Sequence, residues 1–205
     1  MENFYETKNS LYCYPGTNIL INKLDIHDSN KLFKLEKQIV LAKSYILRQN
    51  AKIKNFDKKH FVEIHYFLFC DLYPFAGKFR NENISKGEFT FASWEFIESE
   101  LDRLLLELKN ENYLSNISKE SLVKRLAYYL SELNVLHPFR EGNGRTIREF
   151  IRELAFKNGY ILDLRKTTSK EVFDASVKSV YDTTDLEKIL DLCLIENNSE
   201  PIKLK

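Results

Sequence analysis

The feature that most constrains the fold of this chain of 205 residues is the repetition of apolar residues at helical spacing. Leucine, isoleucine, valine and aromatic residues recur at positions i, i+3, i+4 and i+7, while Pro and Gly number only 4 and 6. The pattern predicts an all-α fold, a bundle of roughly six to eight helices. The apolar stripes that carry this prediction span 32–46, 61–68, 94–108, 122–133, 147–155 and 186–194.

Helix boundary signals accompany several of these stripes. Asp57 and Ser118 stand where an N-cap residue is expected, before the second and the fourth stripe. Gly159 follows the fifth stripe and predicts its C-terminal end.

The segment 78–91, with the sequence KFRNENISKGEFTF, departs from the helical pattern. It alternates β-forming residues such as Phe79, Ile84 and Phe89 with Asn, Ser and Gly. We interpret it as a short β-hairpin, or flap, standing off a helical body. An ordinary interhelical loop is the alternative, and the local sequence does not separate the two.

The remaining organisation is simple. No internal repeat, low-complexity tract or linker divides the sequence, so we expect a single domain over residues 1–205. Residues 1–25 are expected to form a lead-in segment, and 197–205 a frayed tail.

Composition narrows the classes of function. The net charge is +1 and both signs are mixed along the chain, which gives no sign of a nucleic acid partner or a membrane surface. No apolar run approaches the roughly 20 residues that cross a bilayer, and the N-terminus does not resemble a signal peptide. We expect a soluble cytoplasmic protein whose cysteines, Cys13, Cys70 and Cys193, are reduced thiols.

The segment 135–148, VLHPFREGNGRTIR, connects the fourth predicted helix to the fifth. Gly142, Asn143 and Gly144 tolerate positive φ, and glycine lets a ligand approach the backbone closely. Successive N–H groups in such a turn form an anion-binding concavity, which the N-terminus of the following helix reinforces. We predict a phosphate site built from main chain.

Two arginines follow this turn. Cations in the first turns of a helix are unfavourable, yet Arg145 and Arg148 both occur there. An anion between them and the loop would explain the pair, because guanidinium groups suit bidentate phosphate contacts. Solvated arginines are the alternative, which is weaker for both together than for either alone.

Glu141 and His137 add an acid and a base to this loop. Glu141 can hold a magnesium ion that bridges phosphate oxygens, although an ordinary charge at a helix N-terminus is the simpler interpretation of the residue alone. His137 can accept a hydroxyl proton at neutral pH, although a lone histidine at a helix end is more often structural. No Walker A pattern or kinase glycine-rich loop is present. Together the residues predict a phosphoryl- or nucleotidyl-transfer site and leave open which phosphorus is attacked.

At this point the chain resembles the Fic-domain family. HPFREGNGRTIR is similar to the family signature His-x-Phe-x-(Asp/Glu)-Gly-Asn-Gly-Arg-x-x-Arg at every defined position. The resemblance extends to YCYPGTNILINKL, DLYPFAGKFR, NISKG and a Gly-Tyr-x-Leu-Asp turn at 159–163, and so covers nearly the whole chain. It implies an all-α fold with a β-hairpin flap.

The resemblance also implies an activity, the transfer of AMP from ATP, with magnesium, to a Ser, Thr or Tyr hydroxyl of a target protein. His137 would deprotonate the hydroxyl, and Glu141 would hold magnesium. Gly142-Asn143-Gly144 would bind and orient the phosphates, and Arg145 and Arg148 would contact the leaving β- and γ-phosphates.

The flap would bind the target by β-augmentation through Ile84 and Lys86, although Lys86 taken alone is equally consistent with a solvated turn residue. Phe139 would anchor the loop in the core.

Many members of the family carry an inhibitory (Ser/Thr)-x-x-x-Glu-(Gly/Asn) helix whose glutamate pairs with the second arginine. Thr183 and Glu187 have the spacing, but Lys188 follows, and Glu196-Asn197 lacks the Ser or Thr. We therefore hypothesise that a small antitoxin-like partner inhibits in trans. A contact from Glu187 or Glu196 to Arg148 would contradict this hypothesis.

Alternative functions remain at this stage. Relatives in the family also transfer other nucleotide moieties, such as UMP or GMP, and the sequence does not identify a base-reading loop. Gly144-Arg145 argue against the kinase-like branch. A catalytically silent protein-binding module is a different class of function, which the intact motif disfavours.

Overall fold

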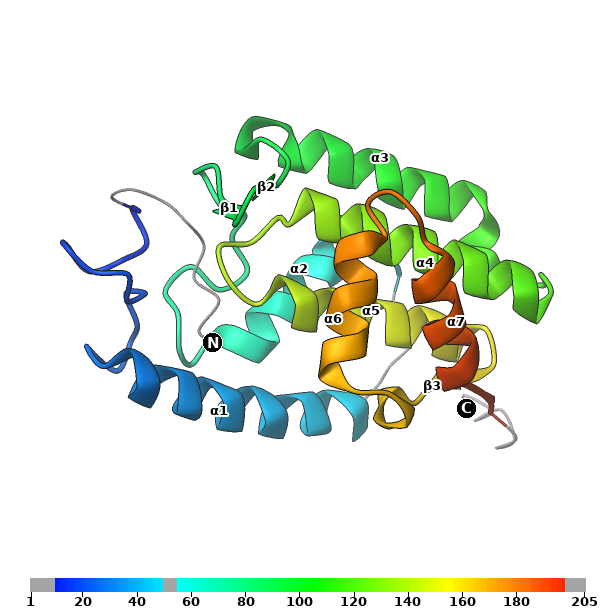
Figure 1. Cartoon of the computed structure of the whole chain (residues 1–205), viewed down its shortest axis with the longest axis horizontal. Helices are drawn as coiled ribbons and strands as arrows, with labels where there is room; N and C mark the ends of the chain where they lie inside the picture. Colours follow the sequence, from blue (N-terminus) through cyan, green and yellow to red (C-terminus); the bar gives the residue numbers. More distant parts are fainter. Residues whose placement is uncertain (1–9, 50–54, 198–205) are drawn as a thin grey trace.

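The computed structural model describes residues 10–49 and 55–197 and contains seven α-helices in that part of the chain, as the apolar stripes predict (Figure 1). Residues 1–9 of the predicted lead-in and 198–205 of the predicted tail lie outside the described residues. The helices are α1 (Ser29–Gln49), α2 (Lys58–Phe69), α3 (Ile97–Asn110), α4 (Lys119–Leu136), α5 (Asn143–Lys157), α6 (Ser169–Lys178) and α7 (Thr184–Cys193).

The predicted helix starts are confirmed in detail. The side chain of Asp57 accepts a hydrogen bond from the His60 N–H, and that of Ser118 accepts one from Ser121, so each satisfies an otherwise unpaired donor. Helix α6 was not predicted by a stripe of its own because it is short and buries only Val172 and Ala175.

Helix α5 lies at the centre of the bundle. Its stripe Ile147, Phe150, Ile151, Leu154 and Ala155 is fully shielded from solvent, because α4 packs on one side and α2 on another. Helix α1 packs along α2, and α3 packs along α4. Helices α6 and α7 pack against each other and against α4 (Figure 1). A fully buried α5 fixes the loop before it, which is where the candidate site lies.

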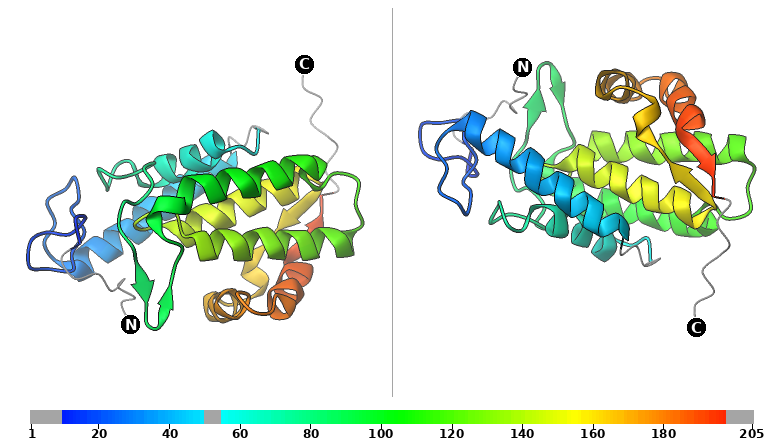
Figure 2. Two further views of the ribbon diagram at one scale, coloured as in Figure 1. Left: turned by 90° about the horizontal axis from the view of Figure 1, so that it is seen from above. Right: turned by 90° about the horizontal axis from the view of Figure 1, so that it is seen from below.

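The predicted flap is a two-stranded hairpin, shorter than the segment 78–91. Strands β1 (Ser85–Lys86) and β2 (Phe89–Thr90) are antiparallel, with Gly87 at φ 58° in the turn. Figure 2 shows the hairpin standing away from the helical body on the same side of the molecule as α6.

The structure corrects the expected helical pattern at two places. Trp94 belongs to a 3₁₀ turn, Trp94–Phe96, that precedes α3. Leu194 does not extend α7 but begins β4 (Leu194–Glu196), which pairs with β3 (Tyr160–Leu162) in antiparallel register. Short strands of this kind escape periodicity because pairing between distant segments, not local pattern, creates them. Further 3₁₀ turns occupy Asn112–Leu114 and Leu164–Lys166.

The three cysteines are free thiols, as expected. Within the described ranges 10–49 and 55–197, no helix combines the length and apolar character that crossing a bilayer requires.

Candidate active site

His137 ends α4 in a left-handed conformation, with φ 46° and ψ 59°, which is unfavourable for a side chain with a Cβ. Buried Arg80 compensates by binding the backbone around it. Its Nε donates to the His137 carbonyl at 2.8 Å, its Nη2 donates to the Leu136 carbonyl at 3.3 Å, and its own N–H donates to the Pro138 carbonyl at 2.9 Å. The turn that aims the histidine is therefore held by a residue far away in sequence.

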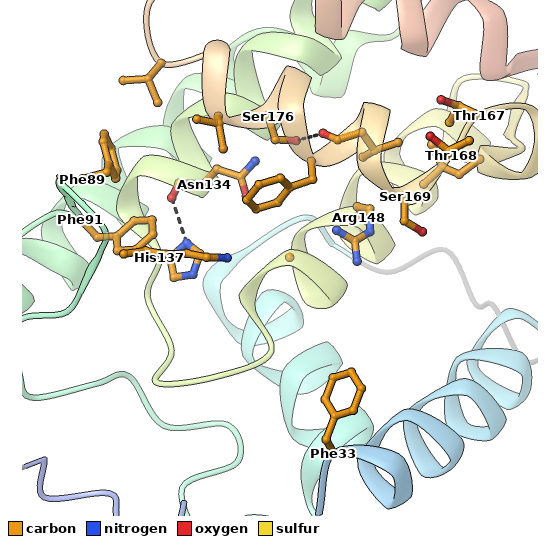
Figure 3. A pocket seen from close by; sticks show the side chains of 17 residues that line it. Phe33, Phe89, Phe91, Asn134, His137, Arg148, Thr167, Thr168, Ser169 and Ser176 are labelled. Carbon is orange, nitrogen blue, oxygen red and sulfur yellow. Dashed lines mark hydrogen bonds between the residues drawn. The ribbon is translucent and has the colours of Figure 1, made fainter. Parts of the chain in front are cut away.

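The imidazole of His137 is oriented from two sides (Figure 3). Its Nδ1 lies 3.0 Å from the Asn134 carbonyl, so Nδ1 carries the proton and the lone pair of the neutral ring is on Nε2. The Phe91 ring stacks on it with the centroids 3.9 Å apart. Burial lowers the pKa of His137 to about 3, against the opposing effect of the Asn134 hydrogen bond, so the ring is a neutral acceptor at physiological pH.

The loop after His137 is fastened to the core by Phe139 and Asn143. Phe139 is completely buried and stacks on His65, which confirms its predicted anchoring position. The amide of Asn143 donates from Nδ2 to the Phe139 carbonyl at 2.7 Å and accepts at Oδ1 from the Phe139 N–H at 2.8 Å. Since Asn143 is only 1% exposed and both ends of its amide bond to Phe139, its side chain braces the loop in this structure and is not open to a ligand.

Gly142 occupies the N-cap of α5 at φ 83°, as the predicted turn requires. A Cβ there would approach the Phe69 ring to 2.3 Å, so the position excludes any side chain. The cap offers no side-chain hydrogen bond, and the first N–H groups of a helix have no intrahelical partner. The N-terminus of α5 therefore has the open N–H groups that the predicted phosphate site requires.

The two predicted arginines have different surroundings. Arg145 is ion-paired, with Nη1 2.6 Å from Glu36 and Nη2 3.2 Å from Glu141. Arg148 has no ion-pair or hydrogen-bond partner within the described part of the chain, and its Nη1 lies 3.0 Å from where a Cβ of Gly144 would be. Burial, with the charges of Arg145 and Arg48, lowers the pKa of Arg148 to about 10. An anion at the start of α5 would relieve this repulsion.

Glu141 uses one of its two carboxylate oxygens. Oε1 accepts from the Gly142 N–H at 2.8 Å and from Arg145, whereas Oε2 has no hydrogen bond among the residues described. Burial raises the pKa of Glu141, Arg145 opposes the rise, and Glu36 adds to it. No group of three or more His, Cys, Asp or Glu side chains suited to a metal occurs in the described ranges. A single open carboxylate oxygen fits magnesium, which takes one or two carboxylates and completes its shell with phosphates and water.

A cavity of about 910 Å³ lies between His137, the start of α5, the flap and α6 (Figure 3). His137, Gly144 and Arg148 line its polar part, and Val172 and Phe173 belong to an apolar wall from α6. Glu141 and Arg145 are not on its lining and lie in the adjoining charge cluster with Glu36. The remaining lining residues are Phe33, Lys86, Phe89, Phe91, Asn134, Leu164, Thr167, Thr168, Ser169, Ser176, Val177 and Val180.

The two flap residues predicted to bind a target are placed differently from each other. Ile84 is 1% exposed, so its side chain packs inward and does not offer a contact to a target in this conformation. Lys86 reaches across the cavity, with its ammonium 4.7 Å from the centroid of the Phe173 ring on α6. Burial lowers the pKa of Lys86.

Sequence reasoning missed three buried polar residues that support the site, Glu36, His65 and Arg80. His65 accepts at Nδ1 from the Gly77 N–H at 2.8 Å and therefore donates from Nε2 to the Glu141 carbonyl at 2.9 Å. Burial lowers the pKa of His65 to about 4, which keeps this neutral tautomer. A charged or polar residue inside an apolar helical stripe, such as Glu36 between Leu32 and Val40, was the available signal.

The potential inhibitory contacts are absent from the described part of the chain. Glu187 accepts a hydrogen bond from the Thr183 hydroxyl at 2.6 Å, and no carboxylate there pairs with Arg148. Inhibition by a separate partner therefore stays a hypothesis, and no contact to Arg148 among the described residues contradicts it.

Comparison with known proteins identifies the family. The Fic/DOC family model matches residues 55–155. The chain is 38% identical over 186 residues to the protein adenylyltransferase VbhT of Bartonella schoenbuchensis, covering 91% of this chain and 39% of VbhT. It is also 38% identical over 168 residues to the probable protein adenylyltransferase y4lH of Sinorhizobium fredii, covering 82% and 86% of the two chains. The crystal structure of BepC from Bartonella tribocorum with bound AMPPNP superposes with a TM-score of 0.85 at 25% identity, covering 90% of this chain and 96% of that one. The chain thus spans well under half the length of VbhT and most of y4lH, and it belongs to the Fic/DOC family.

Proposed function

We propose that this chain is a protein adenylyltransferase, which transfers AMP from ATP to a hydroxyl side chain of a target protein. The observation that carries the proposal is that His137, Gly144 at the start of α5 and Arg148 all line one cavity, and that Arg148 has no partner among the described residues. Its volume of about 910 Å³ accommodates a nucleoside triphosphate. The names of VbhT and y4lH and the AMPPNP bound to BepC support the same activity.

Phosphate binding would use the groups at the start of α5. The backbone N–H groups of Asn143 and Gly144 would cradle the phosphates together with the helix dipole. The Gly142 N–H already donates to Glu141 Oε1, so Gly142 would contribute through the turn that it forms. Arg148 would contact the leaving phosphates directly, and Arg145 would donate through the N–H groups that its two carboxylate partners leave over. The apolar wall from α6 would hold the base.

The transfer step would use the lone pair on His137 Nε2. The target hydroxyl gives its proton to Nε2 while its oxygen attacks the α-phosphorus in line. The bond between the α-phosphorus and the bridging oxygen to the β-phosphorus then breaks, and pyrophosphate leaves. The negative charge of the bound nucleotide would raise the low pKa of His137 and so strengthen it as a base.

Magnesium, when bound, would neutralise charge on the phosphates. Glu141 is the residue that would hold it through Oε2, while His65 fixes the Glu141 backbone and Arg145 fixes Oε1.

Target binding would use the flap. The hairpin stands off the body beside the cavity, so an extended target segment can add to a strand edge and bring its hydroxyl to His137 (Figure 2). With Ile84 buried, we assign the docking contact to the strand backbone and to Lys86. A small inhibitor supplied by another chain remains the proposed regulator of the site.

The test uses ATP labelled on the α-phosphate beside ATP labelled on the γ-phosphate, incubated with the purified chain and magnesium in a cell extract. Label is expected on protein from the α-position alone, and His137→Ala should reduce it by about 10²–10⁴-fold. Labelled UTP and GTP run in parallel should transfer less. Transfer from the γ-position would mean a kinase, and absence of transfer by a chain that mass analysis shows free of a bound inhibitor would favour a silent binding module.

A further inference from the structure

Glu36 is a buried carboxylate on a helix that the family signature does not include. On α1 it occupies the stripe Leu32, Glu36, Val40, which faces the interior, and it is only 8% exposed. A carboxylate in such a position costs several kcal/mol unless it is paired and hydrogen-bonded. Its partners therefore explain why the position tolerates a charge.

Those partners lie in the active site. Glu36 Oε1 is 2.6 Å from Nη1 of Arg145, and the Tyr73 hydroxyl donates to Oε2. The guanidinium also lies over the Phe69 ring, 4.7 Å from its centroid. Arg145 is thus held from the α1 side in a fixed orientation.

The same guanidinium touches Glu141, but only with its other terminal nitrogen. Arg145 Nη2 is 3.2 Å from Glu141 Oε1, and Oε2 of that carboxylate has no hydrogen bond among the described residues. Two carboxylates therefore share one guanidinium, which leaves the cluster with a net negative charge and one open oxygen.

Removing the charge of Glu36 would change this sharing. Arg145 would then have Glu141 as its one remaining carboxylate, and arginine prefers to engage a carboxylate with two parallel hydrogen bonds. Such a pair would occupy both oxygens of Glu141 and neutralise it.

We propose that Glu36 is a positioning residue that holds Arg145 away from full pairing with Glu141 and so keeps a carboxylate oxygen open for the divalent cation of the nucleotide complex. The inference rests on the proposed function in one respect, that Glu141 holds this cation. Glu36 itself touches neither the nucleotide nor the reacting atoms.

The test measures ADP binding to the full chain by calorimetry, with EDTA and with magnesium chloride, and requires no catalysis. Wild-type protein should bind ADP more tightly with magnesium. In Glu36→Gln the affinity without magnesium should stay within about twofold, while the enhancement by magnesium should fall by about tenfold, as for other residues that orient a metal ligand. The magnesium concentration for half-maximal transfer should rise, with kcat recovering at saturating magnesium.

Two further variants make the test specific. Tyr73→Phe removes a hydrogen bond from Glu36 but keeps its charge, so the magnesium enhancement should stay within about threefold of wild type. The double variant Glu36→Gln/Arg145→Gln removes the cation that would close on Glu141 and leaves that carboxylate its hydrogen bond from the Gly142 N–H. It should fold and regain the magnesium enhancement, even where its affinity for ADP without magnesium is lower.

Three results would overturn the inference. Equal weakening of ADP binding with and without magnesium in Glu36→Gln, unrepaired in the double variant, would make Glu36 a purely structural ion pair. Tighter ADP binding without magnesium would show that Glu36 competes with phosphate for Arg145. If the wild-type protein binds ADP with the same affinity with and without magnesium, Glu141 does not hold the metal, and the role of Glu36 falls as well.

Discussion

The two ends of helix α5 differ in how completely their polar groups are satisfied. At the C-terminal end, Lys157 complements the helix dipole, Asn158 donates to the carbonyls of Leu154 and Tyr113, and Gly159 closes the turn at φ 85°. At the N-terminal end there is no acidic residue in the first turn and no side-chain cap, and Arg148 has no partner among the described residues. The first end is built for stability, and the second leaves groups open for a ligand.

Charge pairing along α5 shows the same contrast. Toward its C-terminal half, Glu149 pairs with Arg48 at 3.3 Å and with Arg152 at 2.6 Å, and Glu153 bonds to His60. That set links α1, α2 and α5. Groups without a hydrogen-bond or ion-pair partner among the described residues lie instead between Glu141 and Arg148. Incomplete pairing, rather than the presence of charge, therefore distinguishes the site.

Acid should destabilise the fold mainly through two buried histidines, His137 and His65, which lie beside the N-terminal end of α5. The pKa values of His137 and His65 are lowered to about 3 and about 4, while in the unfolded chain a histidine titrates near 6.5, so between these values the unfolded state binds more protons. Their contribution is complete above pH ~6.5 and is lost as the pH falls, by about 1 kcal/mol per pH unit for each ring. Urea unfolding from pH 7 to 4.5 measures the slope. His65→Gln should be about 1 kcal/mol per unit shallower than wild type, and an unchanged slope would contradict the assignment.

Glycine substitutions compare the two ends directly. Gly142→Ala adds both left-handed strain and a Cβ 2.3 Å from Phe69, and should lower the free energy of unfolding by about 3 kcal/mol or more. Gly159→Ala adds the strain alone, because nothing lies within 4 Å of its Cβ position, and should cost about 1 kcal/mol. Unfolding in guanidinium chloride measures both free energies. Equal losses in the two variants would mean that the Phe69 ring moves aside for the new Cβ.

Two arginines one turn apart on α5 should separate binding from stability. Arg148→Gln should weaken ADP binding by about tenfold without lowering the melting temperature, because it removes from a helix N-terminus a cation that has no partner in the described part of the chain. Arg152→Gln breaks a pair with Glu149, which is 3% exposed, and should cost roughly 1–3 kcal/mol of stability with ADP affinity unchanged. Calorimetry measures the ADP affinity and thermal melting measures the stability of each variant. A lower melting temperature in Arg148→Gln would contradict the assignment of Arg148 to binding alone.

Much of the fold could be predicted from local sequence. The stripe Ile147 to Ala155 is the buried face of α5, and Asp57 and Ser118 cap the helices that they were expected to cap. These features depend on contacts within a few residues, which periodicity and capping rules describe. The β3–β4 pair could not be predicted in the same way, since Leu194 meets Leu162 only after the chain has folded.

Local sequence patterns were enough to predict the helical class and the order of groups from His137 to Arg148, because a helix end, a glycine turn and a helix start are local structures. Which of these groups face the cavity depends instead on packing between distant segments. It directs the Asn143 amide to Phe139, buries Ile84, and pairs Arg145 with Glu36 across more than a hundred residues. Arg148 is then left near Gly144 as a cation without a partner among residues 10–49 and 55–197. The physical reason is that a side chain's charge state and hydrogen bonds depend on what other elements bring to it, and a motif specifies its own residues but not its surroundings.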